Sequence, residues 1–107
     1  SKLDIPILAT EYAPGRLYGM AQWIQQGATD MLRGDVAVSG GIPPLIRIAH
    51  MAEGFRMKCE IHHGGNSLNN VANLHFILSI NIWDCYEVIP AQTQIPTNLC
   101  WPESPDI

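Results

Sequence analysis

Short apolar runs alternate along the chain with longer segments in which apolar residues recur at helical spacing. Four runs have the length of β-strands and are bounded by glycine, proline or charged residues; they cover residues 5–9, 31–36, 57–61 and 85–89. Their starts lie roughly 26 to 28 residues apart, which suits one strand, one helix and two short loops. The pattern predicts a repeating β/α unit.

Each of the three intervening segments predicts an amphipathic helix. Gly27 is a plausible stop for the first helix, and Gly54 for the second. The prolines at 43 and 44 suit the first turn of the second helix, where a missing N–H costs little. Ser67 is a candidate N-cap for the third helix. The predicted apolar faces consist of Leu17, Met20, Ala21 and Ile24, then Leu45, Ile48, Ala49 and Ala52, then Leu68, Val71, Ala72 and His75.

The predicted order is β-α-β-α-β-α-β, which is typical of an α/β fold with a parallel sheet and right-handed crossovers. Residues 1–90 form this region, and residues 91–107, with three prolines and no periodicity, are expected to be an irregular tail. A closed (β/α)8 barrel needs eight strands and about 250 residues. Four units leave both sheet edges open. Three alternatives follow: the other half is a separate or deleted segment, copies of the chain pair, or the unit is a small open α/β domain.

Composition narrows the class of protein. The formal charge is −4 and the six basic residues are scattered, so nucleic acid is not an expected partner. No apolar run approaches the roughly 20 residues that span a bilayer, and no signal core begins the chain, so we expect a cytoplasmic protein. Cys59, Cys85 and Cys100 lack zinc-finger spacing, and the first two lie in predicted strands. We therefore expect buried, reduced thiols.

An acidic residue or a histidine lies at the end of each of the four predicted strands. These residues are Glu11, Asp35, the pair His62 and His63, and Glu87. In parallel β/α folds the chemistry lies at the carboxyl ends of the strands, because the βα loops meet there. These positions are therefore the candidate functional site.

Asp35 and His62 are separated by one β/α unit, so we expect them at the same level of adjacent strands. A carboxylate beside an imidazole sets its tautomer and favours the imidazolium, which suits acid/base chemistry near neutral pH. The structural alternative is that Asp35 caps the turn at Ser39-Gly40-Gly41 and His62 is a satisfied histidine at the mouth of the fold.

Several motifs together resemble a known family. They are ATE at 9–11, RGDVAVSGG at 33–41, PPLIRIAHMAEGF at 43–55, CEIHHGGNSLNNVANLH at 59–75 and YEV at 86–88. Between Ile5 and Pro90 the chain resembles the second half of the barrel, strands five to eight, in the mandelate racemase branch of the enolase superfamily. The resemblance implies a half-barrel of four parallel β/α units.

The resemblance also implies roles for the residues at the strand ends. Glu11 matches the family's third carboxylate ligand of Mg²⁺. Asp35 and His62 match its acid/base dyad, and Glu87 matches a glutamate that hydrogen-bonds the substrate carboxylate where an enolate forms. His63 remains an alternative to His62, because only one of two successive strand residues points into the barrel mouth.

The implied reaction is proton abstraction next to a carboxylate, through an enediolate whose charge Mg²⁺ stabilises. Glu87, if protonated, would donate a hydrogen bond to the developing oxyanion. Dehydration of a sugar acid is the preferred reaction, and racemisation of a hydroxy acid is the second. The family's first two metal ligands, second acid/base group and capping domain have no counterpart in this chain. Two functions therefore remain: part of a magnesium-dependent enzyme completed by a missing N-terminal barrel half, or a noncatalytic remnant that self-associates.

Overall fold

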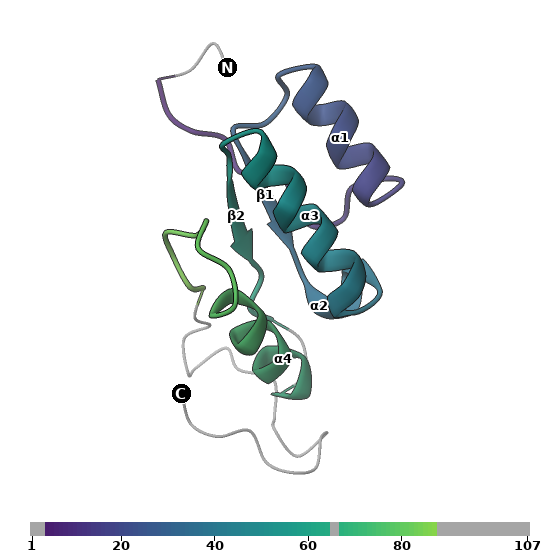
Figure 1. The fold of residues 1–107 in the computed structure, drawn as a ribbon, viewed down its shortest axis with the longest axis vertical. Coiled ribbons are helices and arrows are strands. Elements are labelled where there is room, and N and C mark those ends of the chain that lie inside the picture. Colours follow the sequence, from purple (N-terminus) through teal and green to yellow (C-terminus); the bar gives the residue numbers. More distant parts are fainter. Residues whose placement is uncertain (1–3, 65–66, 88–107) are drawn as a thin grey trace.

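The computed structural model describes residues 4–64 and 67–87 and contains two parallel strands and four helices (Figure 1). The strands β1 (Met31–Gly34) and β2 (Lys58–Ile61) pair from Met31↔Lys58 to Gly34↔Ile61. The two residues of every pair are separated by one β/α unit of the chain. The helices are α1 (Leu17–Gln25), α2 (Val36–Ser39), α3 (Ile42–Gly54) and α4 (Ser67–Ile77). The predicted parallel α/β architecture is confirmed.

The two outer predicted strands are not regular strands in the described part of the chain. Leu8 forms a single parallel bridge to Met31, and Tyr86 forms one to Ile61. The four segments therefore lie in sequence order across the sheet, but only the middle two form a ladder. Among the described residues each outer segment pairs along one edge only, and Pro6 removes a backbone donor from the first. The expected half-barrel of four complete β/α units is thus seen only in part.

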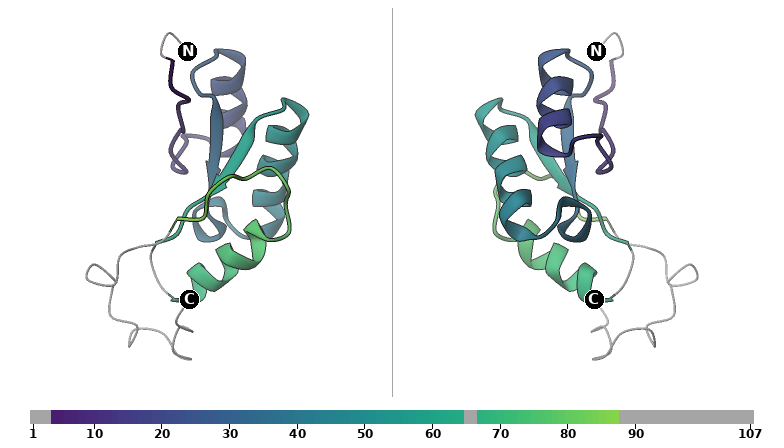
Figure 2. Two further views of the ribbon diagram at one scale, coloured as in Figure 1. Left: turned by 90° about the vertical axis from the view of Figure 1, so that its left-hand side faces the viewer. Right: turned by 90° about the vertical axis from the view of Figure 1, so that its right-hand side faces the viewer.

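Helix α3 packs on both strands and supplies the largest share of the core. Its predicted apolar face is confirmed, because Leu45, Ile48, Ala49 and Ala52 are all buried. Gly34 lies beneath it, and an added Cβ would lie 2.2 Å from Leu45 Cδ1, so a larger residue would displace the Leu45 side chain. Helices α1 and α3 lie side by side on one side of the sheet, and α4 lies at the carboxyl end of the strands (Figure 2).

The predicted apolar face of α4 was wrong. Leu68 and His75 are exposed, and the buried face instead contains Asn73, Phe76 and Ile77. The helix takes this orientation because two of its asparagines form hydrogen bonds at the end of β1, as described below. Ser67, the predicted cap, is the first residue of the helix.

A short helix, α2, was not predicted. The run expected as a strand over 31–36 ends at Gly34, and Asp35 becomes the N-cap of α2 by accepting a hydrogen bond from Val38 N. Asp35 is therefore a cap, but its side chain caps the start of α2 and not the Ser39-Gly40-Gly41 turn of the structural alternative. Gly40 ends the helix with φ 89°, in the left-handed region.

The expectation of buried thiols holds for one of two described cysteines. Cys59 is buried in β2, and burial raises the pKa of its thiol to about 12. Cys85 is exposed, because its segment is a loop whose backbone N–H groups at 84 and 85 donate to the Glu60 carboxylate. Cys100 and the predicted tail at 91–107 lie outside the described residues. None of the helices in residues 4–64 and 67–87 is long and apolar enough to cross a membrane.

Candidate active site

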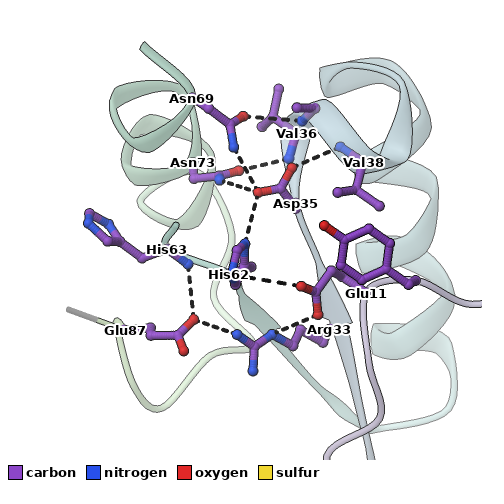
Figure 3. A network of polar contacts seen from close by, with 12 residues as sticks. Glu11, Arg33, Asp35, Val36, Val38, His62, His63, Asn69, Asn73 and Glu87 are labelled. Atoms are coloured by element: carbon purple, nitrogen blue, oxygen red, sulfur yellow. Dashed lines mark hydrogen bonds and ion pairs between the residues drawn. The ribbon is translucent and has the colours of Figure 1, made fainter. Parts of the chain in front are cut away.

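Asp35 and His62 each follow directly on one of the two paired strands. Because β1 and β2 are parallel and in register at Gly34↔Ile61, the next residues emerge side by side. The backbone N–H of His62 also donates to Gly34 O at 2.8 Å. Their side chains meet, with His62 Nδ1 3.2 Å from Asp35 Oδ2 (Figure 3). The structure thus brings together the two residues that their spacing along the chain placed side by side.

The Asp35 carboxylate is buried and accepts four hydrogen bonds. Oδ1 accepts from Val38 N at 2.8 Å. Oδ2 accepts from Asn69 Nδ2 and Asn73 Nδ2, each at 2.8 Å, and contacts His62. Burial by itself would raise the pKa of Asp35, but the donors of Val38, Asn73, Asn69 and His62 together hold it below the usual value. Asp35 is therefore an anion at neutral pH.

The other ring nitrogen of His62 points toward Glu11. His62 Nε2 lies 3.8 Å from Glu11 Oε1, and both side chains are largely shielded from solvent. Since Asp35 is an acceptor, the nitrogen facing it must carry the proton. When the imidazole is neutral, Nε2 is therefore its unprotonated nitrogen, which is the form a general base requires.

Arg33 bridges the two outer carboxylates of the site. Its Nε lies 3.2 Å from Glu11 Oε2, an ion pair whose alignment falls short of a hydrogen bond. A terminal guanidinium nitrogen donates to Glu87 Oε2 (Figure 3). Arg33 and Asp35 are two residues apart in β1 and its extension, and alternate strand residues share a face. One cation thus lies between Glu11 and Glu87.

Glu87 is an acceptor in this structure. Besides Arg33, the backbone N–H of His63 donates to its Oε2 at 3.0 Å. Burial alone would raise the pKa of Glu87, but the hydrogen bonds from His63 and Arg33 and the positive charge of Arg33 lower it. The predicted donor role needs a protonated carboxyl, so it would require Arg33 to release Glu87 first.

The structure distinguishes the two histidines by what their rings contact. The His63 ring turns away from Asp35 and lies edge-on to Tyr86, with Nδ1 2.6 Å from the phenol oxygen. Burial lowers the pKa of His63. Burial also raises the pKa of Tyr86, so both groups are neutral at pH 7. The geometry of an acid/base pair with Asp35 therefore belongs to His62.

Sequence reasoning missed three residues of this cluster. Asn69 and Asn73 were overlooked because the apolar pattern assigned another face of α4 to the core. Their one-turn spacing, on the helix that follows the histidine pair, was the available signal. Arg33 is part of the RGDVAVSGG motif. Its two-residue separation from Asp35 places both residues on one face of the strand.

The geometry of the cluster bears directly on metal binding. Within residues 4–64 and 67–87, no group of three or more His, Cys, Asp or Glu side chains is arranged to hold a metal ion. The one matching carboxylate, Glu11, is already paired with Arg33. Mg²⁺ usually binds several oxygen ligands with near-octahedral geometry. The described residues do not fit Mg²⁺ on their own.

Comparison with known sequences decides the family. Residues 1–103 match the sequence model of the family described as enolase C-terminal domain-like. The chain belongs to the enolase C-terminal domain-like family. The resemblance to the enolase superfamily is thereby confirmed. The match runs past residue 90, and the boundary proposed there stays a prediction, since residues 88–107 lie outside the described part.

Two solved structures resemble this enolase-type domain. One is D-glucarate dehydratase from Agrobacterium tumefaciens complexed with magnesium, with 37% identity and a TM-score of 0.66 over 81% of this chain and 22% of that one. The other is an enolase superfamily member from Polaromonas sp. JS666, with 28% identity and a TM-score of 0.74 over 84% of this chain and 24% of that one. The chain thus spans about a quarter of the length of these relatives. No match is found among curated proteins.

Proposed function

We propose that this chain supplies one half of the active site of an acid-sugar dehydratase, or a hydroxy-acid racemase, that removes a proton next to a carboxylate. The observation that supports it best is the Asp35–His62 contact at adjacent strand ends, with His62 Nε2 facing Glu11. The family supplies the reaction class, and the glucarate dehydratase relative favours dehydration.

The chemistry assigned to this chain centres on His62. A base outside this chain takes the proton next to the carboxylate and gives an enediolate, which collapses with formation of a carbon–carbon double bond and loss of the adjacent hydroxyl. Protonated His62 donates to that hydroxyl through Nε2, so it leaves as water. In racemisation, neutral His62 accepts the proton on Nε2, and a group outside this chain returns one to the opposite face.

The neighbouring residues act on His62 and on the substrate. Asp35 holds the proton on Nδ1 and stabilises the imidazolium. Glu87 stands at the edge of the site with Arg33, where we place the substrate carboxylate. Once Glu87 no longer binds the Arg33 guanidinium, Arg33 can form a bidentate contact with the substrate carboxylate.

The proposed cofactor of the complete enzyme is Mg²⁺, as in the magnesium complex of the glucarate dehydratase relative. Glu11 is the one ligand we assign to it in this chain. Because the described residues do not form a metal site by themselves, the remaining ligands must come from other strands. The partner in this proposal is the N-terminal half of the barrel.

The test uses the native species that contains this chain, after its mass and polypeptide composition are measured. A panel of sugar acids that includes D-glucarate is incubated with Mg²⁺ in D₂O. Proton NMR then follows deuterium incorporation next to the carboxylate and formation of the 2-keto-3-deoxy product. His62→Asn should abolish product formation, for which His62 is the proposed acid, and should abolish deuterium incorporation where His62 is the base of a racemisation. His63→Asn, the matched control, should retain most of the activity. Equal losses in the two variants would contradict the assignment of His62.

A second candidate function is a noncatalytic remnant that self-associates. It is favoured by the outer segments, which bond to the sheet at single bridges, and by the exposed apolar side chains of Ile5, Tyr12 and Tyr18. Native mass spectrometry separates the two functions. Homo-oligomers of the 11.8 kDa chain alone would support the remnant, whereas a companion polypeptide with the missing strands would support the enzyme.

A further inference from the structure

Two asparagines, one turn apart on α4, contact both the start of α2 and the Asp35 carboxylate. Asn73 Oδ1 accepts from Val36 N at 2.8 Å, and Asn69 Oδ1 accepts from Ala37 N at 3.2 Å. The Nδ2 group of each asparagine donates to the same oxygen, Asp35 Oδ2, at 2.8 Å (Figure 3). The same two-point contact is therefore made twice, by residues separated by four positions.

The orientation of both amides is determined by the backbone. The N–H groups of Val36 and Ala37 are donors, so each amide must turn its oxygen toward α2. Its NH₂ group then faces Asp35. A flipped amide would set donor against donor on one side and acceptor against acceptor on the other. Asn73 is fully buried, where such mismatches are most costly.

The amides hold the Asp35 carboxylate in one rotation. Val38 N holds Oδ1 while the two amides hold Oδ2, so the carboxylate plane cannot turn without breaking hydrogen bonds. The remaining acceptor direction of Oδ2 is taken by His62 Nδ1. That geometry places the imidazole proton on Nδ1 and leaves Nε2 facing Glu11.

We propose that Asn69 and Asn73 are positioning residues that hold the Asp35 carboxylate in one orientation, and thereby hold the His62 ring with Nδ1 toward it. This inference rests on the proposed function for its catalytic meaning, but its physical content concerns the chain alone. The competing role is structural: the same amides would merely cap α2. Both roles predict lower stability on substitution, and only positioning predicts a change at Asp35 and His62.

The experiment is an NMR titration of the 107-residue chain and its variants. The ¹⁵N shifts of His62 report which ring nitrogen carries the proton, and the ¹³C shift of the Asp35 carboxyl reports its pKa. Asn69→Ala and Asn73→Leu remove the donors. Asn70→Ala is the matched control on the same helix, because Asn70 Oδ1 is buried without a hydrogen-bond partner among the described residues. Circular dichroism checks that each variant folds.

Wild type should show the Nδ1–H tautomer of neutral His62. Losing one donor should free the Asp35 carboxylate to rotate, so a smaller share of neutral His62 should carry its proton on Nδ1. The pKa of Asp35 should rise, because a donor that favours its anion is gone. If Asn73→Leu fails to fold, Asn69→Ala at the less buried position provides the same test.

The inference would be overturned by a folded Asn69→Ala variant in which the His62 tautomer and the Asp35 titration are unchanged. Capping of α2 would then be the only role of the asparagines. This outcome is distinct from failure of the proposed function. Absence of activity on every sugar acid would remove the dehydratase assignment, while the NMR result would still decide whether the asparagines set the state of the dyad.

Discussion

Asp35 and His62 stand 3.2 Å apart because the backbones that carry them are hydrogen-bonded neighbours, each emerging one residue beyond the last pair of a parallel ladder. Their proximity therefore depends on the strand register more than on any loop. A shift of one residue in the pairing would turn one of the two side chains to the opposite face.

Asp35→Asn should destabilise the fold although it preserves the shape of the side chain. The new NH₂ group would face donors that now meet a carboxylate oxygen. We expect the free energy of unfolding to fall by about 3 kcal/mol, measured by urea denaturation. Asp84→Asn is the control, because the exposed Lys58–Asp84 pair should contribute less than about 1 kcal/mol. Equal effects of the two substitutions would show that the four donors do not stabilise Asp35.

The fold should lose stability in acid through Asp35 and Glu87. Both have folded-state pKa values below their usual ones, so their contribution is present above the ordinary values of 3.8 and 4.5. It is lost as the pH falls through the lowered values. Urea denaturation at a series of pH values below 5 should show a falling free energy of unfolding. A profile that stays flat down to pH 2 would contradict the lowered values.

Arg33→Met should raise the pKa of Glu87, because the guanidinium hydrogen bond and charge that lower it are removed. The cost in stability should stay below about 1 kcal/mol, since Glu87 is partly exposed to solvent. A ¹³C titration of the Glu87 carboxyl measures the change. Lys58→Met removes a cation elsewhere on the surface and should leave Glu87 unchanged.

Cysteine labelling should separate Cys85 from Cys59. The exposed Cys85 thiol should react readily with a maleimide at neutral pH, whereas Cys59 should react only after denaturation, because it is buried and its pKa is about 12. Peptide mass mapping identifies the labelled site. Labelling of both residues at one rate in the native protein would mean that β2 opens readily.

Leu32→Ala should destabilise the fold strongly because Leu32 is fully buried in β1 and belongs to the apolar core. Truncating a buried leucine costs about 2 to 5 kcal/mol. Leu78→Ala makes the same chemical change at a side chain that is 65% exposed, and should have little effect. Thermal denaturation of both variants measures the difference, and similar midpoints would contradict the assigned core.

The sequence predicted those features that depend on local pattern and on spacing along the chain. The prediction of the apolar face of α3 was correct because one buried stripe of the helix packs on the sheet, and apolar periodicity alone is sufficient to identify such a stripe. The pairing of β1 with β2, and with it the meeting of Asp35 and His62, followed from the regular repeat of the β/α unit. The family resemblance rested on the sequence motifs that contain Asp35 and His62.

Tertiary structure decided the features in which polar groups compete for partners. Helix α4 buries Asn73 instead of the predicted Leu68 because the Asp35 carboxylate and the start of α2 need donors and acceptors, and apolar periodicity does not report that need. Arg33 gained its place between Glu11 and Glu87 because segments far apart in the chain meet at the carboxyl end of the sheet. The residue types at the site are local information, whereas the hydrogen bonds that set their charge and orientation arise only when distant segments pack together.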